Sequence, residues 1–220
     1  MKRRIIEAIE RKKIIAILRG LSADACVRTA EALYAGGIEL VEVTFDQKNV
    51  ERINETLKAI SQICQTMGVQ MLVGAGTVTS CEMVELACKA GAAYMISPNT
   101  DLEVIRRTVE LGCVSIPGAL TPSEAVAAHQ AGADFVKLFP IDVLGPSYLK
   151  AIRAPLNQIR FMAVGGVDQN NIAAYRDAGA CGFGIGGCLV KRDWIEAGQY
   201  DRITELAREF CSRLRDKGGK

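Results

Sequence analysis

The chain has 220 residues, of which 49% are hydrophobic, and its 27 Lys and Arg residues against 25 Asp and Glu residues give a formal net charge of +2. This length favours a single domain, residues 1–220, because α/β barrels commonly run from about 200 residues upward. A nearly neutral chain without a long basic run argues against a nucleic-acid partner, whose binding surface normally clusters Lys and Arg. The charge is compatible with ligands that are small polar or phosphorylated molecules.

The cysteines and the apolar runs indicate the cellular location of the protein. The eight cysteines are scattered, without a Cys-x-x-Cys pair or a Cys/His cluster. This pattern is typical of reduced thiols that serve as small core residues, so we expect a cytoplasmic location. No stretch approaches the run of about 18 apolar residues that a membrane-spanning helix needs. Residues 1–13 lack the apolar core of a signal peptide and are expected to form an amphipathic helix.

After that helix, short apolar runs alternate with longer amphipathic segments. The eight predicted strands are residues 14–18, 40–44, 71–76, 94–97, 113–116, 135–139, 161–164 and 182–185. The predicted helices include residues 25–34, 50–67, 83–89, 103–111, 124–130 and 200–214. Several of these end on a small residue and a glycine, which accepts the left-handed conformation that terminates a helix. The repeat favours an α/β fold, a single (β/α)8 TIM barrel with an extra N-terminal helix, over an open doubly wound sheet.

A lysine interrupts the apolar run at residues 135–140. Side chains alternate between the two faces of a strand, so Lys137 shares its face with the two nearest phenylalanines. Lysine is seldom fully buried without a partner or a function. By the same alternation, the side chain of Glu42 points to the other face of its strand from the two flanking valines. The valines suit the face that packs against the helices. We expect both Lys137 and Glu42 to point into the barrel.

Two interpretations of this pair are open. A buried ion pair would be purely structural, although desolvation of both ions offsets most of their attraction. Alternatively, the sheltered Lys137 has a lowered pKa that frees its amine to attack a carbonyl, and Glu42 handles protons on the resulting imine. The single histidine, His129, is expected on a helix, which leaves no Ser/His/Asp triad and no histidine-based metal site. We therefore expect no metal and no cofactor.

Further candidates follow the C-terminal ends of the predicted strands, where barrel enzymes bind their substrates. Arg19 has the inward parity and suits a carboxylate or phosphate oxygen, or else is a solvated rim residue. Thr77 follows the small residues 74–76, which let the backbone approach a ligand, and it either binds an anionic oxygen or caps the next helix. Glycine pairs at residues 165–166 and 186–187 follow the seventh and eighth strands, where barrel enzymes usually form a phosphate cradle.

A set of motifs in a fixed order adds a resemblance to a known family. They are residues 41–44 (VEVT), 74–78 (GAGTV), 96–98 (ISP), 117–118 (PG), 121–124 (TPSE), 137–140 (KLFP), 165–167 (GGV) and 186–187 (GG). Together they resemble the 2-keto-3-deoxy-6-phosphogluconate (KDPG) / 4-hydroxy-2-oxoglutarate (KHG) aldolase family over nearly the whole chain. The resemblance implies a metal-independent class I aldolase, usually a homotrimer, that splits a 2-keto-3-deoxy sugar acid to pyruvate and an aldehyde.

The resemblance also implies roles for individual residues. Lys137 matches the Schiff-base lysine, and Glu42 matches the general acid/base. The implied binding residues are Thr77 at the pyruvyl carboxylate, Pro98 and Phe139 in the pocket wall, and Gly165 and Gly166 in the phosphate loop.

Two positions depart from the family pattern. Phosphogluconate members usually carry an arginine four residues after the glutamate, and this chain has Asp46 there. An anion beside a binding site for anions should weaken binding, unless Arg19 or Lys48 substitutes. The family's serine in the last phosphate loop falls at Gly187 or Cys188. Both departures bear on whether the substrate carries a phosphate.

Three functions are compatible with these residues. The main prediction is an aldolase that forms an imine between Lys137 and a keto-acid and releases pyruvate. The second is a phosphate-binding barrel isomerase or epimerase, in which Glu42 is a base and Lys137 gives electrostatic support without a covalent intermediate. The third is a degenerate barrel that binds a ligand without catalysis, which Asp46 favours.

Overall fold

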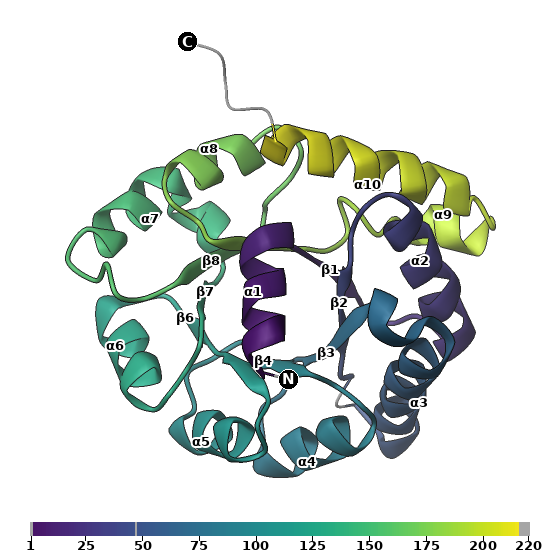
Figure 1. Cartoon of the computed structure of the whole chain (residues 1–220), viewed down its shortest axis with the longest axis horizontal. Helices are drawn as coiled ribbons and strands as arrows, with labels where there is room; N and C mark the ends of the chain where they lie inside the picture. The colour runs from purple at the N-terminus through teal and green to yellow at the C-terminus, as the bar shows by residue number, and fades with distance from the viewer. Residues whose placement is uncertain (1, 47, 216–220) are drawn as a thin grey trace.

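The computed structural model describes residues 2–46 and 48–215, which form a ring of parallel strands surrounded by helices (Figure 1). The strands are β1 (Ile14–Leu18), β2 (Leu40–Thr44), β3 (Leu72–Gly76), β4 (Tyr94–Ile96), β5 (Val114–Ile116), β6 (Gly118–Ala119), β7 (Val136–Leu138), β8 (Phe161–Val164) and β9 (Gly182–Ile185). The α-helices are α1 (Lys2–Lys12), α2 (Ala23–Ala35), α3 (Val50–Met67), α4 (Cys81–Lys89), α5 (Leu102–Glu110), α6 (Pro122–Gln130), α7 (Gly145–Arg153), α8 (Ile172–Asp177), α9 (Arg192–Glu196) and α10 (Tyr200–Arg215), and the short 3-10 helices are η1 (Gly68–Gln70) and η2 (Ile141–Val143).

The strands form one sheet in the order β5-β4-β3-β2-β1-β9-β8-β7-β6, and the paired neighbours are parallel. Pro117 separates β5, which pairs with β4, from β6, which pairs with β7. The backbone amide of Lys137 donates to the carbonyl of Pro117 at 2.9 Å, across this break. The two segments therefore form one interrupted strand of the barrel. The predicted eight-strand barrel is confirmed, with its fifth strand longer than predicted.

Side chains of the strands separate into two apolar layers, as the period-two alternation predicts. Ile15, Leu40 and Phe135 pack with other inward residues inside the barrel. Val41 and Val136, with the opposite parity, pack in the larger layer between the strands and the outer helices. Glu42 and Lys137 lie on strands whose neighbouring residues face the helices, so both charged side chains are inside the ring.

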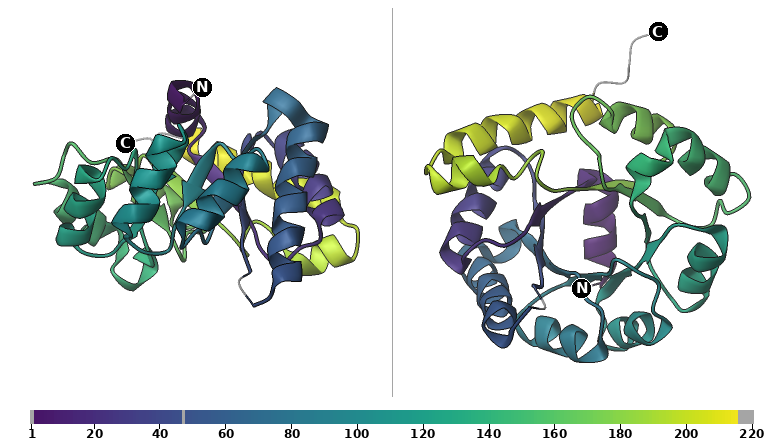
Figure 2. Two further views of the ribbon diagram at one scale, coloured as in Figure 1. Left: turned by 90° about the horizontal axis from the view of Figure 1, so that it is seen from below. Right: turned by 180° about the vertical axis from the view of Figure 1, so that it is seen from behind.

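Helix α1 covers one end of the barrel. Ile5 and Ile9 on its apolar face are buried in the interior cluster with strand residues such as Ile15. The side view in Figure 2 shows α1 projecting at that end, and Figure 1 shows it across the centre of the ring. Because α1 leads directly into β1, it covers the N-terminal ends of the strands. The opposite end, where the strands finish, is left for the site.

Most helix ends follow the sequence signals. Gly91 and Gly112 have positive φ angles at predicted helix-to-strand turns. The turn after α2 differs, because Gly37 takes the positive φ and Gly36 does not. A Cβ on Gly36 would lie 2.4 Å from the Cβ of Ala207 on α10, so this glycine permits close helix packing. No helix of the described residues is long and apolar enough to cross a membrane.

Candidate active site

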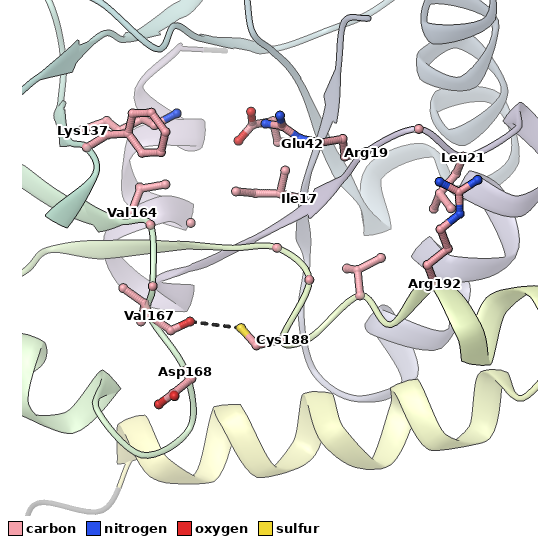
Figure 3. A pocket seen from close by; sticks show the side chains of 18 residues that line it. Ile17, Arg19, Leu21, Glu42, Lys137, Val164, Val167, Asp168, Cys188 and Arg192 are labelled. Carbon is pink, nitrogen blue, oxygen red and sulfur yellow. Dashed lines mark hydrogen bonds between the residues drawn. The ribbon is translucent and has the colours of Figure 1, made fainter. Parts of the chain in front are cut away.

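A cavity of about 660 Å³ opens where β1, β2, β7, β8 and β9 end (Figure 3). Its size is typical of small-molecule sites. The predicted site residues that line it are Arg19, Glu42, Lys137, Phe139, Gly165, Gly166 and Gly187. Two predicted residues, Thr77 and Pro98, are not among its lining residues. The position at the C-terminal ends of the strands is where barrel enzymes carry out their chemistry.

Lys137 is the most buried cation of the cavity, with 6% of its surface exposed. Its Nζ lies 4.5 Å from the centroid of the Phe139 ring, and its side chain points toward Glu42 in Figure 3. Burial lowers the pKa of Lys137, Glu42 opposes this shift, and the nearby Arg19 adds to it. Because desolvation disfavours an ammonium ion, the free amine becomes more accessible at neutral pH. A free amine is the form that attacks a carbonyl carbon.

Glu42 faces Lys137 from β2 and is 2% exposed. Burial raises the pKa of Glu42, while Lys137 and Arg19 partly offset this effect. Within the described residues, Glu42 and Lys137 act on each other through space and form no direct ion pair. The structure therefore does not bear out a purely structural salt bridge. It holds an amine and a carboxyl group, each shifted toward its neutral form, on opposite sides of one cavity.

The small residues of β3 make room for side chains. A Cβ on Gly76 would lie 1.7 Å from the Oε1 atom of Glu42, and a Cβ on Gly74 would lie 2.0 Å from the ring of Tyr94. Tyr94 in turn donates its hydroxyl to the carbonyl of Val41 at 2.6 Å. The expectation that this glycine-rich strand lets the backbone approach a ligand stays a prediction, and the structure shows a second use of its small residues. Gly76 positions Glu42, which requires no side chain at residue 76.

Arg19 lies at the end of β1, and its side chain is drawn beside Glu42 in Figure 3. It is exposed at the rim yet close enough to lower the pKa values of both Glu42 and Lys137. Arg19 can therefore be a solvated rim residue and still bind an anionic group of a substrate. A forked guanidinium at this place suits a carboxylate near the lysine.

Two loops with glycines form the wall beyond Lys137. Gly165 and Gly166 have φ angles of 93° and 69°, and a Cβ on Gly166 would lie 2.2 Å from the Cβ of Asp142. The thiol of Cys188 donates to the carbonyl of Val167 at 3.0 Å and joins the two loops, as the dashed line in Figure 3 shows. Gly187 has open space beside it. Both alternatives for the family's serine position, Gly187 and Cys188, line the cavity.

Thr77 and Pro98 lie at the ends of β3 and β4, outside the lining of this cavity. Thr77 has a φ of 58°. The alternative role of Thr77 as a helix cap is wrong, because the Ser80 hydroxyl accepts from the amide of Met83 and caps α4. The contacts of Thr77 and Pro98 to a substrate stay predictions.

Asp46 does not line the cavity of Lys137. It borders a separate small pocket with Arg52 and Glu55, and its Oδ1 accepts from the amide of Lys48 at 3.2 Å. Of the two proposed substitutes for the missing arginine, Arg19 lines the main cavity and Lys48 does not. Asp46 therefore borders a different pocket from Lys137, and its predicted effect on substrate binding stays a prediction.

Two charged lining residues were missed from the sequence. Arg192 begins the short helix α9, and Asp168 follows the Gly165-Gly166 loop. The short helix α9 carries too little periodicity to be recognised, and nothing local says that its first residue turns to the cavity. Among the described residues, no group of His, Cys, Asp and Glu could hold a metal ion.

Comparisons with known proteins agree with this geometry. The family model described as KDPG and KHG aldolase matches residues 5–206. A probable 2-dehydro-3-deoxy-6-phosphogalactonate aldolase of Rhizobium meliloti is 40% identical over 182 residues, which cover 82% of this chain and 82% of that protein. The 2-dehydro-3-deoxy-6-phosphogalactonate aldolase of Escherichia coli is 36% identical over 205 residues, or 92% of this chain and 95% of that protein.

A solved structure gives the same result in three dimensions. The KDPG aldolase of Legionella pneumophila, with pyruvate captured as a covalent carbinolamine intermediate, is 27% identical and superposes with a TM-score of 0.80. The alignment covers 92% of this chain and 96% of that chain. Sequence, fold and site agree, and the chain belongs to the KDPG and KHG aldolase family and is a class I aldolase.

Proposed function

We propose that this aldolase cleaves a 2-keto-3-deoxy-6-phospho sugar acid of six carbons to pyruvate and a three-carbon aldehyde phosphate, with Lys137 as the Schiff-base residue and Glu42 as the proton carrier. The observation that carries the proposal is the buried Lys137 opposite Glu42, without a direct ion pair, at the inner end of a cavity whose outer wall is built from glycine loops. The relatives from R. meliloti and E. coli are named for 6-phosphogalactonate cleavage, which supports this substrate class.

The first step uses the neutral forms of both groups. The Lys137 amine attacks C2 of the keto-acid, and a proton moves from nitrogen to oxygen to give a carbinolamine. Glu42 in its acid form protonates the departing hydroxyl, and water leaves. The products are an iminium ion on Lys137 and a carboxylate on Glu42, and the new positive charge stabilises that carboxylate.

The second step breaks the carbon chain. The Glu42 carboxylate takes the proton of the C4 hydroxyl, C4 becomes an aldehyde carbon, and the C3–C4 bonding electrons move into the iminium to give an enamine. The aldehyde leaves, and Glu42 returns its proton to C3. Water then adds to C2 with loss of a proton to Glu42, and the carbinolamine releases pyruvate and the free amine.

The glycine loops are the proposed site for the phosphate group. Gly165, Gly166 and Gly187 line the cavity and lack side chains that would keep an anion from the backbone. Arg19 would then bind the substrate carboxylate near C2, since it lies beside the catalytic pair. Thr77 and Pro98 complete the proposed pyruvate end, as the family resemblance implies, and Phe139 packs against the Lys137 side chain.

We include two further points in the proposal, a homotrimeric assembly and a cytoplasmic location. The family resemblance supports both, and the eight cysteines are free thiols, which suits a reducing compartment. Light scattering coupled to gel filtration measures the assembly, and a monomer or dimer at micromolar concentration would contradict it.

Trapping of the imine tests the function. Incubation with pyruvate and sodium borohydride should add a reduced pyruvyl group to Lys137, located by peptide mass spectrometry, and Lys137→Met should remove the adduct. Pyruvate release should then be measured for the phosphogalactonate and phosphogluconate isomers and for 4-hydroxy-2-oxoglutarate. An isomerase or a non-catalytic binding protein would give neither adduct nor pyruvate. An adduct with cleavage of 4-hydroxy-2-oxoglutarate alone would retain the chemistry and refute the phosphorylated substrate.

A further inference from the structure

The charges that line the cavity are unevenly placed. The lining cations are Arg19, Lys137 and Arg192, and the lining anions are Glu42 and Asp168. Arg19 acts on the pKa values of both Glu42 and Lys137 and is drawn beside Glu42 in Figure 3, so it is the rim cation nearest to this pair. Arg192 is not among the groups that shift either pKa, and Figure 3 shows it beside Leu21, across the cavity from Lys137. Arg192 is therefore the cation of the outer end.

The cavity also carries an anion next to the glycine loop that is proposed to bind the phosphate. Asp168 lines the cavity directly after the Gly165-Gly166 loop, and its Oδ1 accepts from the amides of Asn170 and Asn171 at 2.7 and 3.0 Å. These bonds hold the carboxylate in the loop. Glycine amides alone would thus bind a phosphate beside a fixed negative charge, and a nearby cation is needed to offset it.

The Arg192 guanidinium forms a weak, exposed ion pair with Glu196. Its Nε lies 2.8 Å from the Oε1 of Glu196, one turn later on α9, and both side chains are about two-thirds exposed, at 70% and 66%. Ion pairs this exposed are weak, because water solvates both partners well. A phosphate offers the planar guanidinium two parallel hydrogen bonds, whereas Glu196 accepts one, from Nε.

We propose that Arg192 is a specificity-determining residue that binds the phosphate at the end of the substrate farthest from the Lys137 imine. This inference rests on the proposed function, and it adds a side-chain ligand that selects phosphorylated over unphosphorylated substrates. Arg192 takes no part in bond making or breaking, so its loss should affect binding of the phosphorylated substrate and leave imine formation intact.

The test compares one substrate with and without its phosphate. For Arg192→Gln, the KM of the 2-keto-3-deoxy-6-phospho sugar acid should rise about tenfold or more, since a hydrogen bond to a charged group is lost. The kcat for this substrate and both constants for the unphosphorylated sugar acid should stay within about twofold. Arg192→Lys should restore part of the loss. Glu196→Gln should lower the KM for the phosphorylated substrate, because it releases the guanidinium.

Arg208→Gln is the control for net charge. Arg208 is exposed on the neighbouring helix α10 and does not line the cavity, so its loss should leave both substrates unchanged. Equal losses for both substrates in Arg192→Gln, or no loss for either, would overturn the proposal. So would a wild-type enzyme that does not prefer the phosphorylated substrate.

Borohydride trapping of pyruvate, run on every variant, separates this result from the function itself. Absence of the Lys137 adduct in the wild type refutes the aldolase chemistry. A normal adduct combined with an unchanged KM in Arg192→Gln refutes the role of Arg192 alone.

Discussion

Gly76→Ala should disable catalysis without touching a reactive group. The new Cβ would lie 1.7 Å from the Oε1 of Glu42, 2.4 Å from its Cδ and 2.5 Å from its Cγ. Non-bonded carbon and oxygen atoms rest about 3.5 Å apart, so the carboxyl group must move by more than 1 Å. Displacement of that size at a catalytic group can lower the rate about a hundredfold. Overpacking inside the barrel should also cost about 1–3 kcal/mol of the free energy of unfolding.

The assay follows the catalytic steps separately. In Gly76→Ala we expect a kcat for pyruvate release about a hundredfold lower, while borohydride and pyruvate still label Lys137 on prolonged incubation. Exchange of the pyruvate methyl protons with deuterated water, followed by NMR, reports proton transfer by Glu42 and should slow as much as cleavage does. Urea unfolding checks that the variant is folded under assay conditions.

A double-variant cycle with Glu42→Asp decides whether Gly76 acts through Glu42. The shorter side chain withdraws from the position of the new Cβ, so the two substitutions should combine to a much smaller loss than the product of the single losses. A kcat within threefold of the wild type in Gly76→Ala, or strictly multiplicative losses, would refute the reasoning.

Three further results are expected. Arg19→Gln removes a cation that lowers the pKa of Lys137, so the pH profile of borohydride trapping should move to higher pH, and an unchanged profile would contradict this electrostatic role. The double variant Lys137→Met/Glu42→Gln should raise the free energy of unfolding by about 1–4 kcal/mol at pH 7. Burial raises the pKa of Glu42 above 4.5, so the stability cost of its charge is lost below pH 4.5, and burial lowers the pKa of Lys137 below 10.5, so the cost of its charge is lost above pH 10.5. The gain in urea midpoint of the double variant should therefore shrink below pH 4.5 and above pH 10.5. A gain independent of pH would refute this prediction. Burial raises the pKa values of Cys26 and Cys181 to about 12, so iodoacetamide at pH 8 should label both thiols in the unfolded chain and neither in the native protein, as peptide mass spectrometry would show.

The sequence by itself predicted the barrel and the inward position of Lys137 and Glu42. Helix and strand periods, with glycine at the turns, predict the βα repeat because they depend on residues close together in the chain. The inward direction of Lys137 and Glu42 follows in the same way, since alternation along a strand and the flanking valines are local features. The glycine loops after β8 and β9 could likewise be placed from their position in the repeat.

Only the tertiary structure decided which side chains share the cavity. Asp46 faces a separate pocket, Arg192 reaches the mouth from a five-residue helix, and Gly76 is required by a glutamate on the neighbouring strand. Each of these facts depends on the direction of a loop or on the register between strands. Such contacts join residues far apart in the sequence, and their geometry is set by packing of the whole barrel. No local pattern at residues 46, 76 or 192 carries that information.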